Sequence, residues 1–375
     1  MKLGDANDRV RGVLDALVRD TPEVGLQVAA YLDGELVIDA WAGVADPETG
    51  KAVDGDTLFM LSSTTKGVTS TCMHLCVERH KLSYDMPVAQ VWPEFAVRGK
   101  EKATLRHALC HQTGVPQTPV GYTPDWLPDW DRMCRGIADL DPMFPPGTRT
   151  AYHSLNFGYL IGEILRRVDG RPIARFLAEE ICAPLGISGA YLGVPDSEMH
   201  RVAVLIDAPA APLEYQAGMV GEPAGCNVAE VFNRREVLQA SIPGSGGVFN
   251  ARSVARHYAM LTDILPASRI HDAIELQSFE RDEIYGVRTR RALGYRRGAD
   301  AGPLASPAAF GHVGGGGSFG YADPERRLAI GFAKNYFVYR TAIVTPDRPL
   351  RSVAQHVTEA VFDALGLDQR KNRPL

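Results

Sequence analysis

The sequence lacks the features that would place the chain in a membrane, outside the cell or on nucleic acid. No window approaches the roughly 18 uninterrupted apolar residues of a membrane helix. The first twenty residues contain acids and arginines where a signal peptide would be continuously apolar. The net charge of -5 is spread along the chain, so no basic stripe exists to neutralise phosphates. We therefore expect a soluble, cytoplasmic protein with no membrane or nucleic-acid partner.

Cysteine is also scarce, with six in 375 residues. These cysteines are scattered and have no secretory context, which favours free thiols in a reducing compartment over a disulfide framework. Low-complexity tracts and internal repeats are lacking as well. Apolar residues make up 45% and charged residues 23%, which is ordinary for a globular protein with a large core.

Strand patterns occur at both ends of the chain. Residues 26–32 and 35–42 are β-rich runs separated by Asp33-Gly34, a dipeptide that suits a two-residue hairpin turn. Residues 308–335 read as strand, glycine-rich turn and strand, followed by a helix over about 352–365. A further helix is expected at the N-terminus, and another over the residues that follow Ser63.

The middle of the chain has helical patches broken by proline and glycine. We expect an α+β fold: an α/β sandwich with a mostly antiparallel sheet, built from residues 1–85 and 235–375. Residues 86–234 would form an inserted, mainly helical domain. A cleft between the two parts is the expected place for a site.

Ser63-Thr64-Thr65-Lys66 is the only S-x-x-K in the chain. On a helix this spacing puts the hydroxyl and the amine on one face, about one turn apart. A serine hydroxyl needs a neighbouring base to become a nucleophile, and a desolvated lysine can serve as that base. The alternative is that Ser63 caps the helix and Lys66 is a solvated surface residue.

Two further segments contain candidate groups. Tyr152-His153-Ser154, followed by Asn156, offers a phenol whose pKa a nearby Lys66 would lower, so that it could shuttle protons. The alternative for Tyr152 is an aromatic packing residue with its hydroxyl at the surface. Residues 311–318, GHVGGGGS, allow a backbone N–H to face a developing oxyanion; the alternative is a flexible turn between strands.

Taken in this order, the three segments resemble the beta-lactamase and penicillin-binding-protein superfamily, in its class C-like esterase branch, the family VIII carboxylesterases. Ser63 to Lys66 matches the S-x-x-K of that superfamily, residues 152–154 resemble its Y-x-N, and residues 312–314 resemble its K-T-G in the H-x-G form of many esterases. The resemblance extends over roughly residues 26–335.

The resemblance implies catalytic roles for Ser63, Lys66 and Tyr152, and an oxyanion hole made by the N–H groups of Ser63 and Gly315. The sequence departs from the family where asparagine is replaced by Ser154 and lysine by His312. In beta-lactamases those two side chains help to hold the antibiotic, so their loss weakens that assignment. The candidate substrate contacts are Ser154, Asn156, His312, Gly314, Trp126 and Ser245.

We therefore expect a serine hydrolase that cleaves a small-molecule ester through an acyl-enzyme on Ser63. Three alternatives stay open: an acyltransferase using the same acyl-enzyme, a D-peptidase or weak beta-lactamase, and a non-catalytic ligand-binding protein. The sequence identifies neither the acyl group nor the oligomeric state.

Two motifs compete with this interpretation. Residues 316–320 fit G-x-S-x-G, which would make Ser318 the nucleophile of an α/β-hydrolase, but that fold needs a helix after the serine and an acid and a histidine later in the chain. His107 and His111, with Cys110 beside them, have the spacing of a zinc-binding helix face, but the expected glutamate after His107 is missing. We expect neither a metal nor another cofactor.

Overall fold

A nine-stranded antiparallel sheet joins the two ends of the chain. The computed structural model describes residues 3–209, 228–338 and 352–367. The strand order in the sheet is β3-β2-β1-β13-β12-β11-β10-β9-β8. These strands are β1 (Gly25–Leu32), β2 (Glu35–Asp46), β3 (Lys51–Ala52), β8 (Ser278–Arg281), β9 (Arg288–Arg291), β10 (Arg296–Arg297), β11 (Phe310–Val313), β12 (Phe319–Asp323) and β13 (Leu328–Lys334). The expected fold of helices around an antiparallel sheet is confirmed.

The short strands and the helices complete the fold. Two small sheets contain β4 (Phe59–Met60), β7 (Val248–Phe249) and β5 (Ala190–Tyr191), and β14 (Tyr336–Phe337) with β6 (Ile206–Asp207). The helices are α1 (Leu3–Asp20), α2 (Thr65–His80), α3 (Leu105–Leu109), α4 (Trp130–Ala138), α5 (Asn156–Asp169), α6 (Ile173–Leu177), α7 (Ala183–Leu185), α8 (Val228–Phe232), α9 (Arg235–Leu238), α10 (Ala251–Ala259), α11 (Leu261–Ile264), α12 (Ala267–Ile274) and α13 (Val353–Leu365). None of the helices within the described ranges is long and apolar enough to cross a bilayer.

Local sequence explains the central pairing. Asp33 and Gly34 adopt positive φ angles of 55° and 84°, as the predicted two-residue turn requires, and bring Leu32 opposite Glu35. β1 then pairs along its other edge with β13, whose seven residues are all buried. A strand with both faces covered reads as a continuous apolar run, which is why LAIGFAK is recognisable in the sequence.

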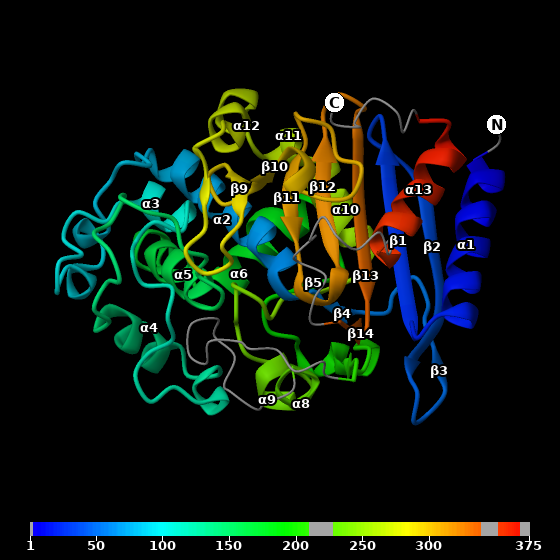
Figure 1. Cartoon of the computed structure of the whole chain (residues 1–375), viewed down its shortest axis with the longest axis horizontal. Coiled ribbons are helices and arrows are strands. Elements are labelled where there is room, and N and C mark those ends of the chain that lie inside the picture. The colour runs from blue at the N-terminus through cyan, green and yellow to red at the C-terminus, as the bar shows by residue number, and fades with distance from the viewer. Residues whose placement is uncertain (1–2, 210–227, 339–351, 368–375) are drawn as a thin grey trace.

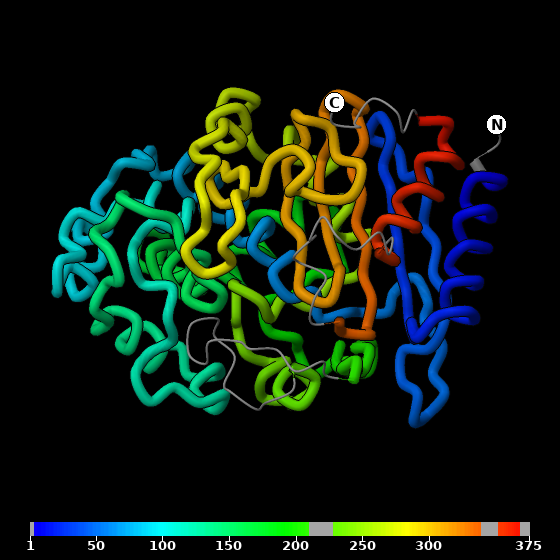
Figure 2. The backbone as a smooth tube through the Cα atoms, in the orientation of Figure 1, coloured from blue at the N-terminus to red at the C-terminus, as the bar shows by residue number. Residues whose placement is uncertain are grey.

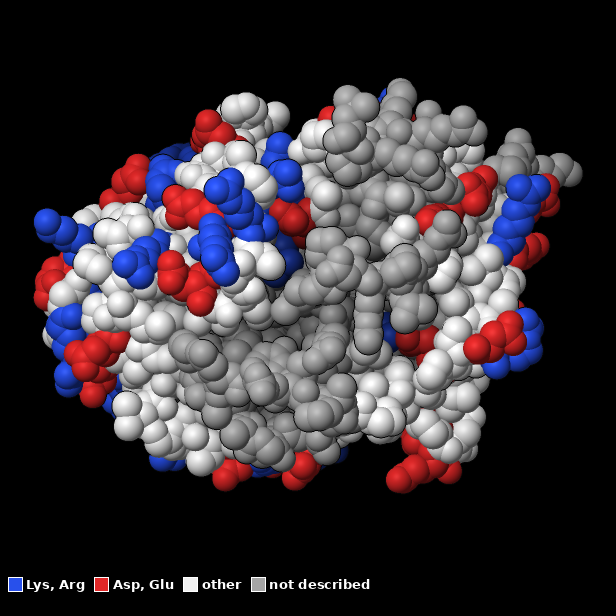
Figure 3. All heavy atoms as spheres, in the orientation of Figure 1, with Lys and Arg blue, Asp and Glu red and all other residues white. Residues whose placement is uncertain are grey.

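Helices cover both faces of this sheet. α1 and α13 lie side by side on one face, where the first and last described segments meet (Figures 1 and 2). α10 packs on the other face against β1, β12 and β13, with α2 beyond it toward the helical end of the molecule. Lysine and arginine are interspersed with aspartate and glutamate over the face shown in Figure 3. The proposed division into residues 1–85 with 235–375 and 86–234 stays a prediction.

A buried ion pair ties the end of β13 to the segment before β1. Lys334 Nζ contacts Glu23 Oε1, and their side chains are only 4% and 5% exposed. Burial raises the pKa of Glu23 and lowers that of Lys334, while the attraction between the two charges opposes both shifts. Removing either side chain would therefore leave the other charge buried without a counterion.

We expect Glu23→Gln to lower the free energy of unfolding by about 3–5 kcal/mol, because it leaves the buried ammonium uncompensated. Guanidinium unfolding monitored by circular dichroism measures this loss. The double variant Glu23→Gln/Lys334→Met removes the orphaned charge and should recover much of it. An unchanged unfolding midpoint in the single variant would contradict this account of the pair.

Candidate active site

Ser63 and Lys66 lie at the start of α2. A single 3₁₀ turn, Ser62–Thr64, precedes the helix and leaves Ser63 partly exposed. One helical turn later, Lys66 is completely buried, and its Nζ lies 3.2 Å from Ser63 Oγ. The N-cap of α2 makes no side-chain capping bond. The alternative of a helix-capping serine and a solvated lysine is therefore wrong.

Two backbone carbonyls hold the Lys66 amine. Nζ donates to Ser154 O at 2.7 Å and to Gly244 O at 2.6 Å, in addition to its contact with Ser63. A neutral amine has two hydrogens and one lone pair. The two carbonyls can take both hydrogens, which leaves the lone pair for the proton of Ser63 Oγ.

Burial is the main cause of a lowered Lys66 pKa. The nearby charges of Arg296 and Arg291 act in the same direction, while Tyr152 opposes them. Lowering the pKa of an amine makes its unprotonated form more abundant near neutral pH. The site thus favours the form of Lys66 that can accept a proton.

The loop that carries the Gly244 carbonyl packs directly on the start of α5. A Cβ placed on Gly158 would lie 1.9 Å from Gly244 N, so only glycine allows this approach. Ser154 lies just before the same helix. Both carbonyl partners of Lys66 are therefore fixed by one backbone contact between α5 and the loop.

Tyr152 lies beside this pair, and three basic side chains lie near its ring. Its ring centroid is 4.8 Å from Lys66 Nζ, 5.6 Å from Arg291 Cζ and 5.7 Å from Arg296 Cζ. The side chain is 2% exposed, and Oη is buried without a hydrogen-bond partner among the described residues. The alternative of a surface hydroxyl is therefore wrong.

Opposing effects act on the pKa of Tyr152. Burial raises it, whereas Lys66, Arg296 and the adjacent hydroxyl of Ser63 lower it, and the net shift is downward. Oη has Ser63 and Lys66 for neighbours without an aligned hydrogen bond to either. A phenol in this position can exchange protons with both groups once a substrate completes the geometry.

The glycine-rich segment forms a tight turn against the Ser63 turn. Gly314 N donates to Ser318 O at 2.7 Å, and a Cβ on Gly314 would lie 2.4 Å from Leu61 O. A Cβ on Gly315 would lie 3.1 Å from Ser62 Oγ. Within the described part of the chain, neither Ser63 N–H nor Gly315 N–H donates a hydrogen bond.

The other predicted contact residues have varied surroundings. His312 is buried with Nδ1 on Val313 O, and burial holds its pKa well below the ordinary value, so it is neutral. Asn156 Nδ2 holds two loop carbonyls, those of Val115 and Gln117, at 2.8 and 2.7 Å. The Asn156 amide therefore supports the loop that precedes α4.

Ser245 and Trp126 complete the predicted set. Ser245 follows Gly244 and has a buried Oγ that is unpaired among the described residues. Trp126 lies in a 3₁₀ turn before α4, with Arg132 Cζ 3.9 Å from its ring centroid. Contact of either side chain with a substrate stays a prediction.

The competing motifs have structural partners. Ser318 is buried and donates to Leu61 O at 2.8 Å, and strand β12 follows it where a nucleophile elbow needs a helix. His107 belongs to the capping box of α3 with Thr104, and His111 Nδ1 accepts the N–H of His153. These two histidines therefore have local structural roles.

Sequence reasoning missed two arginines beside Tyr152. Arg291 ends β9 and Arg296 begins β10, and the two face one another across these antiparallel strands. The only sequence signal is a Tyr-Arg-Arg-Gly tetrapeptide at 295–298. Charged residues of this kind are common at the exposed edges of strands, so the tetrapeptide does not indicate an active site. Their place at the site depends on strand pairing.

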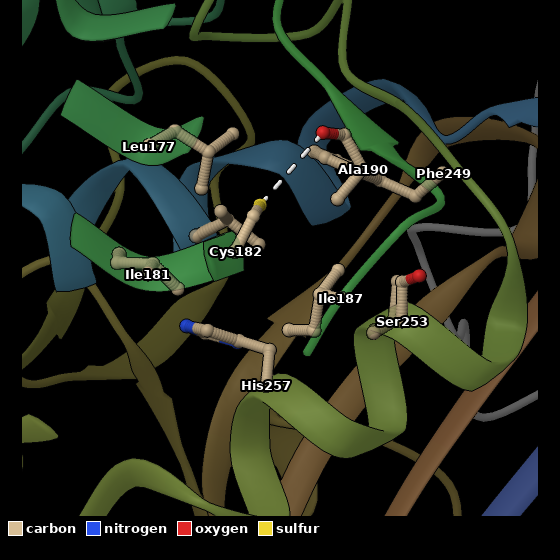
Figure 4. Close-up of a pocket in the computed structure, with 10 residues that line it drawn as sticks. Leu177, Ile181, Cys182, Ile187, Ala190, Phe249, Ser253 and His257 are labelled. Carbon is tan, nitrogen blue, oxygen red and sulfur yellow. Dashed lines mark hydrogen bonds between the residues drawn. The ribbon is translucent and has the colours of Figure 1, made fainter. Parts of the chain in front are cut away.

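A small cavity lies away from this group of residues. Figure 4 shows it between α10 and the helical segment that carries Leu177, Ile181 and Cys182, with His257 on its wall. Its lining is mainly apolar and contains none of Ser63, Lys66 and Tyr152. The cavity is therefore separate from the Ser63, Lys66 and Tyr152 group.

Comparison with known proteins adds independent findings. A family model described as Beta-lactamase matches residues 14–354. Esterase/beta-lactamase LipL of Mycobacterium tuberculosis is 32% identical, over 83% of this chain and 77% of that protein, and esterase EstB of Burkholderia gladioli is 30% identical over 69% and 68%. A crystal structure of a family VIII carboxylesterase superposes with a TM-score of 0.84 at 32% identity, covering 96% of this chain and 97% of the other.

Proposed function

This chain belongs to the beta-lactamase family, and from that membership we propose that it hydrolyses carboxylic esters through an acyl-enzyme on Ser63. The observation that carries the proposal is the buried Lys66 amine, 3.2 Å from Ser63 Oγ, with two carbonyls to hold its hydrogens. Relatives named as esterases support the ester as substrate. The chain is thus a serine hydrolase.

Acylation begins when Ser63 Oγ attacks the ester carbonyl carbon. The Ser63 proton passes to Lys66 and Tyr152 as the new C–O bond forms. The carbonyl oxygen becomes an oxyanion, and the N–H groups of Ser63 and Gly315 donate to it. When the bond to the alcohol oxygen breaks, Tyr152 returns the proton to that oxygen and the alcohol leaves.

Water then attacks the acyl-enzyme on the same carbonyl carbon. Its proton follows the same route through Tyr152 and Lys66 and returns to Ser63 Oγ as the carboxylic acid departs. An ester suits this machinery because its alkoxide leaves more readily than an amide nitrogen. Neutral His312 and the short Ser154 side chain provide fewer contacts for an antibiotic than the lysine and asparagine of beta-lactamases.

The rate constant kcat/KM should rise with pH as the base loses its proton and should reach a plateau. Because burial lowers the Lys66 pKa from its ordinary value of 10.5, and nearby cations lower that of Tyr152 from 10.0, the midpoint of the rising limb should lie below pH 10.5. Neighbouring His153, with a pKa of about 4, is already neutral across that range. A pH profile measured on a neutral ester, corrected for spontaneous hydrolysis, tests this; a midpoint at or above 10.5 would show that the amine is not desolvated.

The function is tested by comparing p-nitrophenyl butyrate with a chromogenic cephalosporin on the purified protein. We expect ester turnover with kcat/KM at least about a hundredfold above that for the cephalosporin, corresponding to roughly 3 kcal/mol of preference in transition-state binding. Comparable rates on both substrates would favour a beta-lactamase. Absence of turnover on either would favour a non-catalytic binding protein.

We also propose that the protein works in the cytoplasm. The support is that Cys72, Cys76, Cys110, Cys134 and Cys182 are buried free thiols, as expected in a reducing compartment; Cys226 lies outside the described residues. Fractionation of the source cells, with activity followed in each fraction, tests this location.

A further inference from the structure

Arg296 is a cation beside the candidate active site, and no carboxylate within the described ranges pairs with it. Its guanidinium carbon lies 5.7 Å from the Tyr152 ring centroid, and the side chain is half-buried. Among the residues that the structure describes, it makes no ion pair, and its Nε is buried without a hydrogen-bond partner. A buried donor left unpaired loses its hydrogen bonds to water without replacement, so this arrangement opposes stability unless something binds there.

Among the described residues, Arg291 has the carboxylate partner that Arg296 lacks. Arg291 lies directly opposite Arg296 and donates to Asp282 Oδ2 at 2.6 Å, with both groups of that pair fully buried. Asp282 also accepts the N–H groups of residues 284 and 285 through Oδ1. Asp282 is thus already engaged, and the two arginines face each other across the strands while only Arg291 has a carboxylate partner among the described residues.

We propose that Arg296 binds a carboxylate carried by the alcohol part of the substrate, so that the natural substrates are anionic esters. This inference rests on the proposed ester hydrolysis at Ser63. A guanidinium presents paired donors in the geometry of a carboxylate, and charge-assisted bonds of this kind are the strong ones.

The position of Arg296 assigns the carboxylate to the alcohol part. Tyr152 returns the proton to the leaving oxygen, so that oxygen lies next to the phenol during the reaction. Arg296 borders the same phenol ring. A carboxylate a short spacer from the leaving oxygen therefore reaches the guanidinium, whereas the acyl chain extends from the other side of the carbonyl carbon.

The number of available cations favours a singly charged group over a phosphate. Lys66 is engaged with two carbonyls, Arg291 with Asp282, and His312 is neutral. In the described part of the site this leaves one unpaired cation for the ligand. One guanidinium matches one carboxylate.

The test compares 3-carboxyphenyl butyrate with its neutral isostere 3-carbamoylphenyl butyrate. We expect Arg296→Gln to lower kcat/KM for the carboxylate ester about 10- to 100-fold more than for the amide, in proportion to a lost charge-assisted bond. The ratio cancels the different reactivities of the two phenols and any common effect on Tyr152. Arg296→Lys keeps the charge and should lose less on the carboxylate ester.

Arg297→Gln is the matched control, because the neighbouring strand residue points to the opposite face and bonds Ala308 O at 2.7 Å. It should leave the ratio unchanged. Equal losses on the two esters in Arg296→Gln, or no loss on either, would overturn the proposal.

A binding measurement separates this inference from the proposed hydrolysis. In the Ser63→Ala background, calorimetric titration with 3-carboxyphenyl butyrate should show binding that weakens at least tenfold when Arg296→Gln is added. If Arg296→Gln leaves the dissociation constant unchanged, the inference is overturned, even if the wild-type protein hydrolyses esters. A different result would refute the hydrolytic scheme alone. In that case binding would depend on Arg296, which supports the anion site, while Ser63→Ala would still hydrolyse the ester at the wild-type rate.

Discussion

Ser63→Ala is expected to lower kcat/KM for p-nitrophenyl butyrate by about five to six orders of magnitude, as removal of a nucleophilic serine does when the acyl-enzyme route is lost. The remaining groups cannot replace Oγ, because the Lys66 amine is directed at the lost oxygen and held by two carbonyls. Spectrophotometric release of p-nitrophenol at high enzyme concentration measures the residual rate.

The neighbouring serine is the matched control. Ser62 is also partly exposed in the same 3₁₀ turn, but the hydroxyl bonded to Lys66 is that of Ser63. Ser62→Ala should stay within about tenfold of the wild type, as expected for a change that leaves the nucleophile and base in place. A Ser63→Ala variant with the wild-type rate, free of contaminating esterase, would place the chemistry elsewhere.

Lys66→Met is expected to lower the rate of acylation by about three to four orders of magnitude, the upper range for loss of a general base. Methionine fills a similar volume but offers no lone pair that can take the Ser63 proton. The carbonyls of Ser154 and Gly244 lose their donor, while the cost of burying an amine disappears. We therefore expect the loss to fall on kcat, with little change in the unfolding midpoint.

Single-turnover kinetics with excess enzyme isolate the acylation step. Lys102→Met, at an exposed lysine outside α2, controls for the general effect of removing a positive charge. Acylation by Lys66→Met within tenfold of the wild type would assign the base role to Tyr152 alone.

Local patterns in the sequence were enough to predict much of the fold. The Asp33-Gly34 turn, the buried run of β13 and the helix after Ser63 each depend on residues close together in the chain. The order of the S-x-x-K, tyrosine and glycine-rich segments then identified the family. That prediction is confirmed by the family match and by the fold of the carboxylesterase.

Long-range geometry could not be predicted from these patterns. The carbonyl of Gly244 lies 178 residues from Lys66, and nothing in a Pro-Gly-Ser-Gly turn indicates that its oxygen accepts from an amine. Arg296 reaches Tyr152 only because β10 pairs between β11 and β9. Lys66 can act as a base because it is buried, whereas a surface lysine stays protonated. Its burial likewise depends on the packing of α5 against the loop that contains Gly244.

Covalent trapping of Ser63 tests the central claim most directly. Incubation with a p-nitrophenyl alkylphosphonate, followed by proteolysis and mass spectrometry, identifies the residue that attacks. We predict one phosphonyl group per chain on Ser63, one equivalent of p-nitrophenol released, and no label in Ser63→Ala. A label on Ser318 or on any other residue, in protein that hydrolyses esters, would contradict the account.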